Sequence, residues 1–248
     1  MQLDGKTVLV TGGSRGLGGS IAYSCAEEGA DLVITGRDKA ALDATADRIR
    51  SLGRLCMAVE LEVTDSAAVD EAANKVWSEM GTVDVAFNNA GTNFFGPTLD
   101  TSDDDWHRVI EVNLSGAFYC CRAFGKRMLE QGRGKIINTS TDLGIRGFAN
   151  AAAYSASKGG LIALSKSLAW EWAPTVTVNV IAPGPFYTDL TKPALDQPEM
   201  AAGLKAAIPL GRWGQPSELG PLAVLMAGQG SDFMTGTVIG IDGGIMRA

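Results

Sequence analysis

Tyr154 and Lys158 are the two side chains whose types and spacing best suit acid–base chemistry. A spacing of four residues places them on one face of a helix. A free phenol ionises near pH ~10 and is a poor base at neutral pH. An ammonium at ~4 Å contributes ~4 kcal/mol at an effective dielectric constant of ~20, enough to lower the phenol pKa by about two to three. We therefore predict a proton-transferring pair, although the same spacing also occurs on ordinary helix surfaces.

Other polar residues fall where predicted strands end. The run Asn88–Gly91 ends one strand, Ser140 and Thr141 end the next along the chain, and Pro183-Gly184 follows a third; Asn113 lies in the helix between the first two. The carboxyl ends of parallel strands share one edge of a sheet, where ligands bind. Ser140 is expected to point away from Thr141, because side chains alternate along a strand.

A glycine-rich turn follows the first predicted strand, at residues 11–18 with the sequence TGGSRGLG. Gly12 allows the turn, Gly16 lets the backbone approach a phosphate, and Gly18 allows close packing of helix against strand. The helix N-terminus then faces the anion. A tight turn without a ligand is the alternative, but the position between a strand and a helix favours dinucleotide binding.

The end of the second strand bears on the choice of cofactor. A site for NAD needs an acidic residue there for the ribose 2′-hydroxyl, and this position is Gly36. The guanidinium groups of Arg37 and Arg15 can instead bind a 2′-phosphate through paired hydrogen bonds. We predict NADP(H) rather than NAD(H); the alternative is that both arginines only solvate the surface. Asp38 is expected to cap the helix that begins at Lys39.

Short β-branched runs alternate with longer segments of helical period from end to end of the chain. This alternation predicts an α/β fold, with a Rossmann-like, doubly wound, seven-stranded parallel sheet and helices on both faces. The predicted strands are 6–11, 31–35, 56–63, 83–88, 135–140, 175–182 and 238–242. The predicted helices are 16–28, 39–52, 66–80, 103–130, 155–172 and 216–228.

We interpret residues 1–248 as a single NAD(P)-binding domain, because the alternation has no break that would mark a linker. The proline-rich stretch from Pro183 to Pro216 interrupts this alternation of strands and helices. A connection this long is typical of a lid or binding loop. We place its central part, 186–215, over the substrate at the carboxyl edge of the sheet.

Composition excludes several classes of partner. The formal net charge is −7, which argues against a nucleic-acid binder or a protein docked on an anionic membrane. The four cysteines form no CxxC pair and His107 is the only histidine, so no metal site is predicted. Cysteine usage and the lack of a signal-like N-terminus or a long apolar run indicate a cytoplasmic protein with a small-molecule partner.

Taken together, these motifs resemble the short-chain dehydrogenase/reductase family in its single-domain form. The resemblance is carried by TGGSRGLG at 11–18, NNAG at 88–91, Asn113, YSASK at 154–158, PGPFYTD at 183–189 and IDGG at 241–244. It covers the whole chain.

The resemblance implies roles for individual residues. Tyr154 resembles the general acid/base that exchanges a proton with the carbinol oxygen, and Lys158 the residue that lowers the tyrosine pKa and holds the nicotinamide ribose. Asn113 resembles the helix residue that anchors a water in the proton relay; a buried polar residue at a helix kink is the alternative. The implied cofactor contacts are Gly12, Ser14, Arg15, Gly16, Leu17, Gly18, Arg37, Glu62, Val63, Asn89, Ala90, Gly91, Tyr154, Lys158, Pro183, Gly184 and Thr188.

The sequence departs from the family pattern at two positions. Thr141 stands thirteen residues before the tyrosine, where the family has its catalytic serine; threonine keeps a hydroxyl for the substrate oxygen but narrows the pocket. Glu62 stands where an aspartate usually lies beside the adenine. Arg146, in the loop after Thr141, is expected to pair either with an anionic substrate or in a surface or intersubunit salt bridge.

The resemblance implies an NADP(H)-dependent oxidoreductase that transfers a hydride between the nicotinamide and a secondary alcohol or ketone. Residues 209–219 are similar to gluconate 5-dehydrogenases and other sugar or polyol enzymes, whereas the glycine turn and Arg37 are similar to 3-oxoacyl-[acyl-carrier-protein] reductases. The alternatives are an NAD(P)-binding sensor or scaffold with little turnover, which only Thr141 favours, and a methyltransferase, which Gly36 disfavours. A homotetramer or homodimer is expected, paired through the helices 103–130 and 155–172.

Overall fold

A seven-stranded parallel sheet forms the centre of the computed structural model, which describes residues 1–246. The strands are β1 (Thr7–Thr11), β2 (Asp31–Gly36), β3 (Cys56–Glu60), β4 (Val85–Asn88), β5 (Gly134–Thr139), β6 (Val176–Pro183) and β7 (Val238–Ile241). Their order across the sheet is β3-β2-β1-β4-β5-β6-β7. Because β1 pairs with both β2 and β4, the direction of winding reverses between β1 and β4, which is where such sheets bind ligands.

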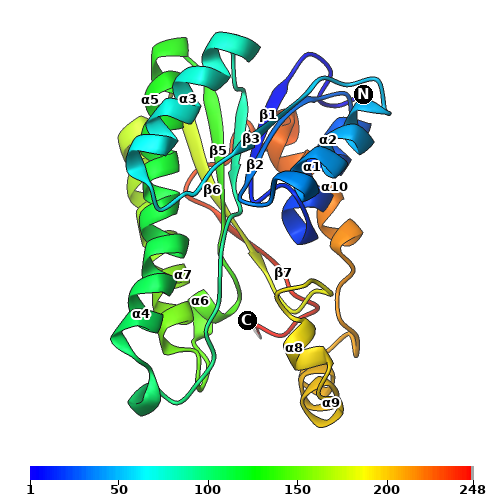
Figure 1. Ribbon diagram of the computed structural model, residues 1–248, viewed down its shortest axis with the longest axis vertical. Helices are drawn as coiled ribbons and strands as arrows, with labels where there is room; N and C mark the ends of the chain where they lie inside the picture. The colour runs from blue at the N-terminus through cyan, green and yellow to red at the C-terminus, as the bar shows by residue number, and fades with distance from the viewer. Residues whose placement is uncertain (247–248) are drawn as a thin grey trace.

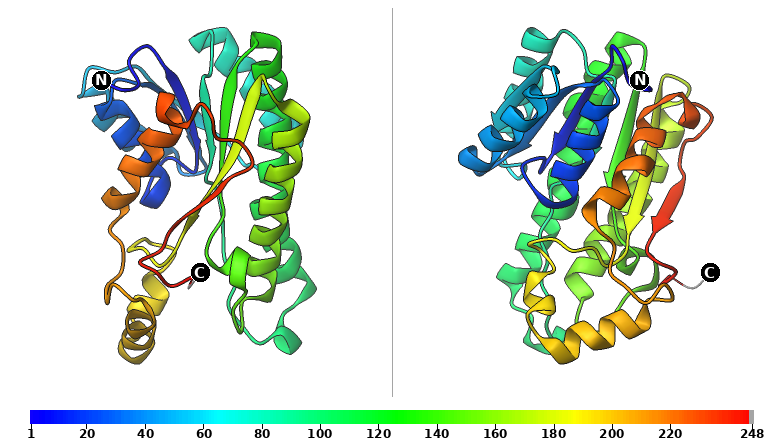
Figure 2. Two further views of the ribbon diagram at one scale, coloured as in Figure 1. Left: turned by 180° about the vertical axis from the view of Figure 1, so that it is seen from behind. Right: turned by 90° about the vertical axis from the view of Figure 1, so that its right-hand side faces the viewer.

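Helices cover both faces of the sheet, as predicted (Figures 1 and 2). One layer contains α1 (Gly16–Glu27), α2 (Lys39–Arg50) and α10 (Gly220–Ala227), and the other contains α3 (Ser66–Met80), α5 (Gly116–Gln131) and α7 (Ala152–Trp172). Shorter helices are α4 (Asp103–Ile110), α6 (Leu143–Arg146), α8 (Lys192–Leu195) and α9 (Pro198–Ala207). The doubly wound α/β fold expected from the alternation is therefore confirmed.

The apolar runs of the central strands are explained by burial on two sides. Along β1, Val8 and Val10 pack into the core beneath α1 and α10, whereas Leu9 packs into the core beneath α3 and α5. Phe87 and Phe124 are among the largest fully buried side chains, one in each core. Strands covered on both faces need no polar alternation, and the sequence of β1 shows none.

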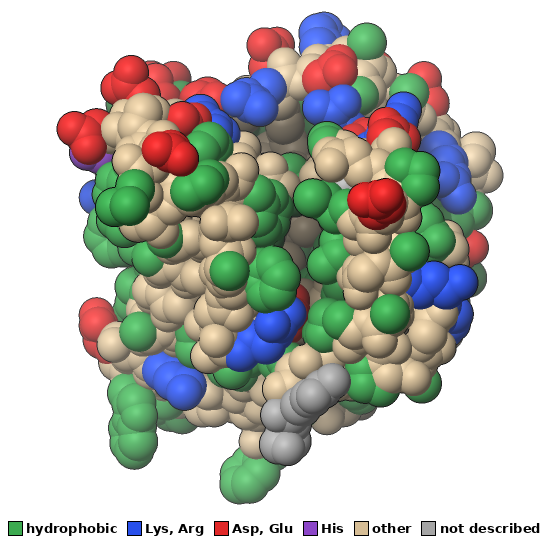
Figure 3. Space-filling view, turned by 90° about the horizontal axis from the view of Figure 1, so that it is seen from below, with side chains coloured by type: hydrophobic (Ala, Val, Ile, Leu, Met, Phe, Trp, Pro, Cys, Tyr) green, Lys and Arg blue, Asp and Glu red, His purple; other side chains and the backbone are tan. Residues whose placement is uncertain are grey.

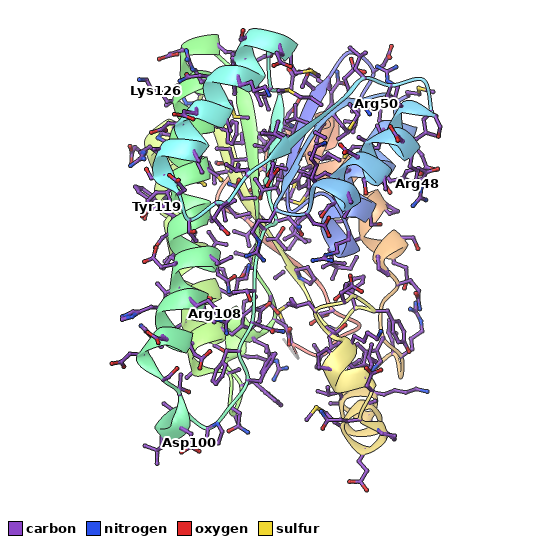
Figure 4. The ribbon with its side chains drawn as sticks, viewed as in Figure 1. Arg48, Arg50, Asp100, Arg108, Tyr119 and Lys126 are labelled. Atoms are coloured by element: carbon purple, nitrogen blue, oxygen red, sulfur yellow. The ribbon has the colours of Figure 1, made fainter. Side chains whose placement is uncertain are left out.

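The helices keep their charged side chains on the outer side. Figure 4 shows Arg48 of α2 and Lys126 of α5 pointing away from the sheet, and both are exposed. The predicted cap of α2 is confirmed, because the Asp38 carboxylate accepts a 3.1 Å hydrogen bond from the backbone N–H of Ala41. This bond satisfies one of the free donors at the helix N-terminus.

The helix predicted over 103–130 is divided. A π-helical turn at Glu111–Ser115 separates α4 from α5, and Asn113 lies at its centre. Such turns insert one residue into a helix and are frequent at functional sites. Directly after the turn, a Cβ on Gly116 would lie 2.9 Å from a Val63 methyl carbon, so only glycine lets α5 approach the chain beyond β3 this closely.

The proline-rich stretch 183–216, predicted to be a lid or binding loop, is partly helical. It contains the helices α8 and α9, each with a proline in its first turn, where proline is favoured. In Figure 1 these helices hang below the sheet on the opposite side from α4 and α6. The last two residues of the predicted 1–248 domain lie outside the described residues.

Candidate active site

A cleft of about 600 Å³ lies at the carboxyl edge of the sheet. Figure 3, viewed from this edge, shows the hollow between the two sides of the molecule. Its walls come from the turns after β1, β2, β4, β5 and β6, so the polar clusters of the sequence do meet at one place. The predicted site residues on its walls are Gly12, Ser14, Arg15, Gly16, Leu17, Arg37, Glu62, Val63, Asn89, Ala90, Gly91, Thr141, Tyr154, Lys158, Pro183, Gly184 and Thr188.

The glycine turn has the backbone geometry that its sequence predicted. Gly12 and Gly16 have φ angles of +63° and +56°, a region that L-residues rarely adopt. Gly18 is not on the cleft wall: a Cβ there would lie 2.2 Å from the carbonyl oxygen of Gly12, so this glycine permits helix–strand packing, as predicted. At Gly16 a Cβ would meet only Thr188, at 3.7 Å, which leaves space for a phosphate beside the turn.

The end of β4 is tied to the glycine turn. The Thr11 hydroxyl accepts hydrogen bonds from the backbone N–H groups of Asn89 and Ala90 at 3.0 and 3.1 Å. The Asn89 side chain donates to the carbonyl oxygens of Thr11 and Gly12. The first half of the NNAG motif therefore fixes the floor of the cleft across the switch point between β1 and β4.

Two arginines lie at the end of the cleft beside β2. The Arg37 guanidinium is 3.4 Å from a carboxylate oxygen of Glu62, and Arg15 is 3.8 Å from Asp189 on the facing loop. All four side chains are more than two-fifths exposed, so these ion pairs contribute little stability and are easily exchanged for another anion. The Glu62 side chain is thus directed toward Arg37, an arrangement that the sequence did not reveal.

Lys158 lines the cleft but is only 4% exposed. Its ammonium donates a 2.7 Å hydrogen bond to the carbonyl oxygen of Thr139, the last residue of β5. Burial lowers the pKa of Lys158 from 10.5 to about 8. A Cβ on Gly91 would lie 3.5 Å from Nζ, so the ammonium sits directly behind the NNAG turn.

Tyr154 shares this wall, one helical turn before Lys158, with its ring 5.9 Å from that of Phe95. The predicted lowering of its pKa is wrong for this structure. Burial, with a smaller contribution from the Asp142 carboxylate, raises the pKa of Tyr154 to about 12, and only the Thr141 hydroxyl acts in the opposite direction. The sequence argument considered the attraction of the ammonium but not the loss of water around the phenolate.

Asn113 is fully buried behind the cleft wall rather than on it. Its amide oxygen accepts from the N–H of Thr92 at 2.8 Å, and its amide nitrogen donates to the Thr92 carbonyl and the Ser157 hydroxyl at 2.9 and 3.0 Å. The side chain therefore joins the π-helical turn to the NNAG turn and to α7. These hydrogen bonds fix the positions of the three segments relative to one another, which is the role expected of a buried polar residue at a helix kink.

Thr141 and Ser140 both line the cleft, but the Ser140 hydroxyl is turned toward α7, where it donates to the Lys158 carbonyl at 3.0 Å. The Thr141 hydroxyl lies within hydrogen-bonding distance of two acceptors, a carboxylate oxygen of Asp142 at 2.9 Å and the Pro183 carbonyl at 3.1 Å. Arg146 holds the other oxygen of Asp142 through two nitrogens, at 3.0 and 2.8 Å. Arg146 therefore forms a salt bridge, but within the chain and to a buried carboxylate rather than at the surface or between subunits.

Asp142 was missed by the sequence reasoning. It is 3% exposed and adjoins Thr141, yet nothing in its own segment marks an aspartate as buried. One signal was available, because Asp142 and Arg146 are four residues apart and can meet on one helical turn. A glycine at 144 makes this turn possible, since a Cβ there would lie 2.8 Å from the Ser140 hydroxyl and 2.9 Å from the Lys158 backbone.

The segment after β6 forms the opposite wall. Gly184 lies against Asp242 of the IDGG motif, where a Cβ would approach to 2.7 Å. The amide of Asn93, from the segment after β4, donates to the Leu190 carbonyl at 3.3 Å, so the two walls touch across the cleft. Phe186, Leu190 and Thr191 line the cleft but were not among the predicted site residues.

The fold and this cleft define a class of protein. A cleft at the switch point of a doubly wound parallel sheet, joining a glycine-rich turn to a tyrosine and a lysine on one helix, is the arrangement of a dinucleotide-dependent oxidoreductase. The open space beside Gly16 and the left-handed backbone at Gly12 fit a pyrophosphate there.

Comparison with known proteins identifies the family. A family model described as Enoyl-(Acyl carrier protein) reductase matches residues 12–246. The chain is 39% identical to the D-threitol dehydrogenase of Mycolicibacterium smegmatis, over 98% of this chain and 94% of that protein. It is 36% identical to the 3-oxoacyl-[acyl-carrier-protein] reductase of Escherichia coli, over 99% of each. The chain belongs to the short-chain dehydrogenase/reductase family, as the motifs predicted, and is an oxidoreductase that acts on CH–OH groups.

A solved structure agrees with this assignment. The gluconate 5-dehydrogenase of Burkholderia cenocepacia, in complex with NADP and tartrate, has a TM-score of 0.96 and 34% sequence identity, covering 100% of this chain and 97% of that one. Among residues 1–246, no helix is both long and apolar enough to cross a membrane. Over the same residues, no group of three or more His, Cys, Asp or Glu side chains could hold a metal ion.

Proposed function

We propose that this protein transfers a hydride between NADP(H) and a secondary alcohol or ketone. One observation supports the proposal above all: a single cleft joins the glycine turn to the wall that holds Tyr154 and Lys158. We also propose that residues 1–248 act as one NAD(P)-binding domain, because strands from both halves of the chain supply the walls of this cleft.

The 2′-phosphate of NADP(H) is matched by Arg37 and Arg15. Gly36 leaves no carboxylate to repel a phosphate at the end of β2, and both guanidinium groups are exposed with only weak partners. An arginine fork binds phosphate through two parallel hydrogen bonds, which are stronger than the exposed ion pairs that they would replace. NADP is also the cofactor named for the gluconate 5-dehydrogenase structure.

When bound, NADPH supplies the hydride that adds to the carbonyl carbon. Tyr154, whose pKa is about 12, keeps its proton at neutral pH and donates it to the carbonyl oxygen as that oxygen gains charge. Lys158, still mostly protonated at pH 7 with a pKa of about 8, is placed to hold the ribose and to return a proton to the phenolate. Thr141 lines the same cleft as Tyr154, and its hydroxyl would contact the reacting oxygen there. Asn113 fixes the position of these groups through Ser157 and is the predicted anchor of a relay water.

The substrate class supported best is a neutral polyhydroxy ketone or its alcohol. Among the described cleft-lining residues the only cations are Arg15, Arg37 and Lys158, which are assigned to the cofactor. Arg146, the one cation considered for an anionic substrate, is bound through two nitrogens to Asp142. Sugar acids, which carry a carboxylate, are therefore the second choice, whereas 3-oxoacyl chains are uncharged and are not disfavoured by this argument.

A substrate panel tests the proposal. The full chain is incubated with NADPH or NADH and a set of polyhydroxy ketones, oxo-sugar acids and 3-oxoacyl thioesters, and coenzyme oxidation is followed by absorbance. We expect NADPH-dependent reduction of the neutral ketones, and Tyr154→Phe should lower it by about 10²- to 10⁴-fold while binding NADPH with unchanged affinity. Tight NADPH binding without turnover of any ketone would favour the sensor or scaffold alternative.

We further propose a homotetramer or homodimer that pairs through α5 and α7. Phe118 on α5 and Trp170 on α7 are 39% and 89% exposed, and large apolar side chains in such positions mark contact surfaces. A cytoplasmic location is also proposed, because Cys25, Cys56, Cys120 and Cys121 are all buried and unpaired. Light scattering of the wild type and of Trp170→Glu would test the assembly.

A further inference from the structure

Glu62 holds a carboxylate beside Arg37 at the end of the cleft next to β2. One of its oxygens lies 3.4 Å from the Arg37 guanidinium, and the other accepts a 3.3 Å hydrogen bond from the backbone N–H of Thr64. Glu62 and Arg37 both line the cleft, and their side chains are 41% and 74% exposed. Over residues 1–246, this carboxylate is the only ion-pair partner of Arg37.

The pairing of β2 with β3 brings this carboxylate to the end of β2. Gly36 and Glu60 are partners in the parallel register, and the N–H of Leu61 donates to the Gly36 carbonyl at 2.9 Å. Glu62 is the next residue, so it reaches a place where residue 36 has no side chain of its own. A Cβ on Gly36 would meet the Ser14 hydroxyl first, at 3.4 Å. The sequence of β2 lacks an acid at this end, but the structure supplies one from the segment after the neighbouring strand.

The two coenzymes differ at the ribose 2′ carbon, which carries a hydroxyl in NAD(H) and a phosphate in NADP(H). A carboxylate only accepts hydrogen bonds, so it can bind the hydroxyl but not the phosphate dianion. A guanidinium only donates, so the phosphate must either share Arg37 with Glu62 or displace it. Both arrangements weaken phosphate binding, because two anions then meet at one cation or an ion pair is lost.

We propose that Glu62 is a coenzyme-specificity residue. Its carboxylate competes with the 2′-phosphate of NADP(H) for Arg37 and accepts a hydrogen bond from the 2′-hydroxyl of NAD(H). It therefore reduces the preference for NADP(H) that Arg37 and Arg15 create. Arg15 pairs instead with Asp189, at 3.8 Å. The inference rests on the proposed function only in that the cleft binds a nicotinamide dinucleotide.

A role at the adenine would give a different result. The family pattern places an acid at this position beside the adenine, which is common to both coenzymes. A glutamate that contacted only the adenine would affect NADPH and NADH equally. A glutamate that acts at Arg37 affects them in opposite directions, so the ratio of the two dissociation constants separates the roles.

The experiment is a fluorescence titration of the full chain with NADPH and with NADH, for the wild type, Glu62→Gln and Glu62→Ala. Glutamine removes the charge but keeps the size, and alanine removes the whole carboxylate arm. We expect both variants to bind NADPH about two- to fivefold more tightly, the size of one exposed ion pair, and NADH at least about twofold more weakly. The ratio of the NADH to the NADPH dissociation constant should then rise by at least about threefold. Melting temperatures should change little, because the pair is exposed.

Glu130→Gln is the matched control. Glu130 lies 3.4 Å from the Arg127 guanidinium on α5, the same separation as in the pair of Glu62 with Arg37. Neither Glu130 nor Arg127 is among the described residues that line the cleft. The control removes the same charge from the protein and should change neither coenzyme affinity.

Adenosine 2′,5′-bisphosphate and adenosine 5′-monophosphate test the ribose 2′ position without the nicotinamide and without turnover. Glu62→Gln should bind the bisphosphate about two- to fivefold more tightly than the wild type does, and the monophosphate no more tightly. The gain should be largely lost at about 1 M salt, where charges are screened beyond ~3 Å.

An equal change for the two coenzymes, an unchanged ratio, or a gain that persists in full at high salt overturns the role of Glu62. A wild type that binds neither coenzyme overturns the proposed function together with this inference. Binding of NADPH with the same ratio in wild type and variants overturns only the role of Glu62.

Discussion

The ammonium of Lys158 donates a 2.7 Å hydrogen bond to the carbonyl oxygen of Thr139. This contact joins the middle of α7 to the end of β5 and places a buried cation behind the NNAG turn. The lysine is therefore both a structural link and a titratable group. The effect of burying Lys158 on the free energy of unfolding can be measured separately from its contribution to catalysis.

The pH dependence of stability should reveal the burial of Lys158. Its pKa falls from 10.5 in the unfolded chain to about 8 in the folded protein, so the unfolded chain binds more protons between these values. The resulting destabilisation is fully present below pH 8 and is relieved as the pH rises toward 10.5, by on the order of 3 kcal/mol. Urea unfolding of the wild type and Lys158→Met, compared at several pH values, should show the wild type gaining over the variant across this range. A constant difference would contradict the burial.

Coenzyme choice should depend on Arg37 and Gly36. Arg37→Ala is expected to weaken NADPH binding by about tenfold or more, the loss of a charge-assisted hydrogen bond, with little effect on NADH. Gly36→Asp should weaken NADPH and strengthen NADH, and its Cβ fits because it would lie 3.4 Å from the Ser14 hydroxyl. Fluorescence titration with both coenzymes measures this. Arg127→Ala, on the outer side of α5, is the matched control and should change neither affinity.

Alanine substitutions at Gly18 and Gly19, adjacent glycines of α1, should change the stability of the protein in opposite directions. A Cβ at Gly18 would lie 2.2 Å from the Gly12 carbonyl and 2.4 Å from the Asn89 amide, so Gly18→Ala should destabilise the protein by about 2 kcal/mol or more. At Gly19 the nearest atom would be at 3.7 Å, and alanine in a helix should add about 0.5–1 kcal/mol. Chemical denaturation of both variants decides the point, and equal effects would contradict the packing described here.

Retention of a proton on Tyr154 predicts a direction of catalysis. Because its pKa is about 12, the phenol is a ready acid for ketone reduction but a weak base for alcohol oxidation at neutral pH. Below the pKa the phenolate fraction rises about tenfold per pH unit, so raising the pH from 7 to 9 should accelerate oxidation by up to about 10²-fold while changing reduction much less. Initial rates in both directions, with the matched ketone and alcohol, measure the ratio. Oxidation that does not respond to pH would show that bound coenzyme lowers the phenol pKa to neutrality.

Local signals were enough to determine the fold and most of the cleft. Alternating apolar strands and helical periods predicted the seven strands, and the steric needs of Gly12 and Gly18 follow from the turn itself. The capping of α2 by Asp38 depends on neighbours within three residues. The apolar period of each element, the left-handed glycine of the turn and the cap are properties of residues close along the chain, so the sequence alone determined them.

Only the tertiary structure decided the electrostatics of the site. The raised pKa of Tyr154, the pairing of Glu62 with Arg37 and the burial of Asp142 depend on which residues exclude water and which carboxylate a cation reaches first. The same is true of Asn113, whose amide is used by Thr92 and Ser157. The burial of these side chains and the distances between their charges arise from the packing of whole helices and strands, so they cannot be inferred from the spacing of residues along the chain.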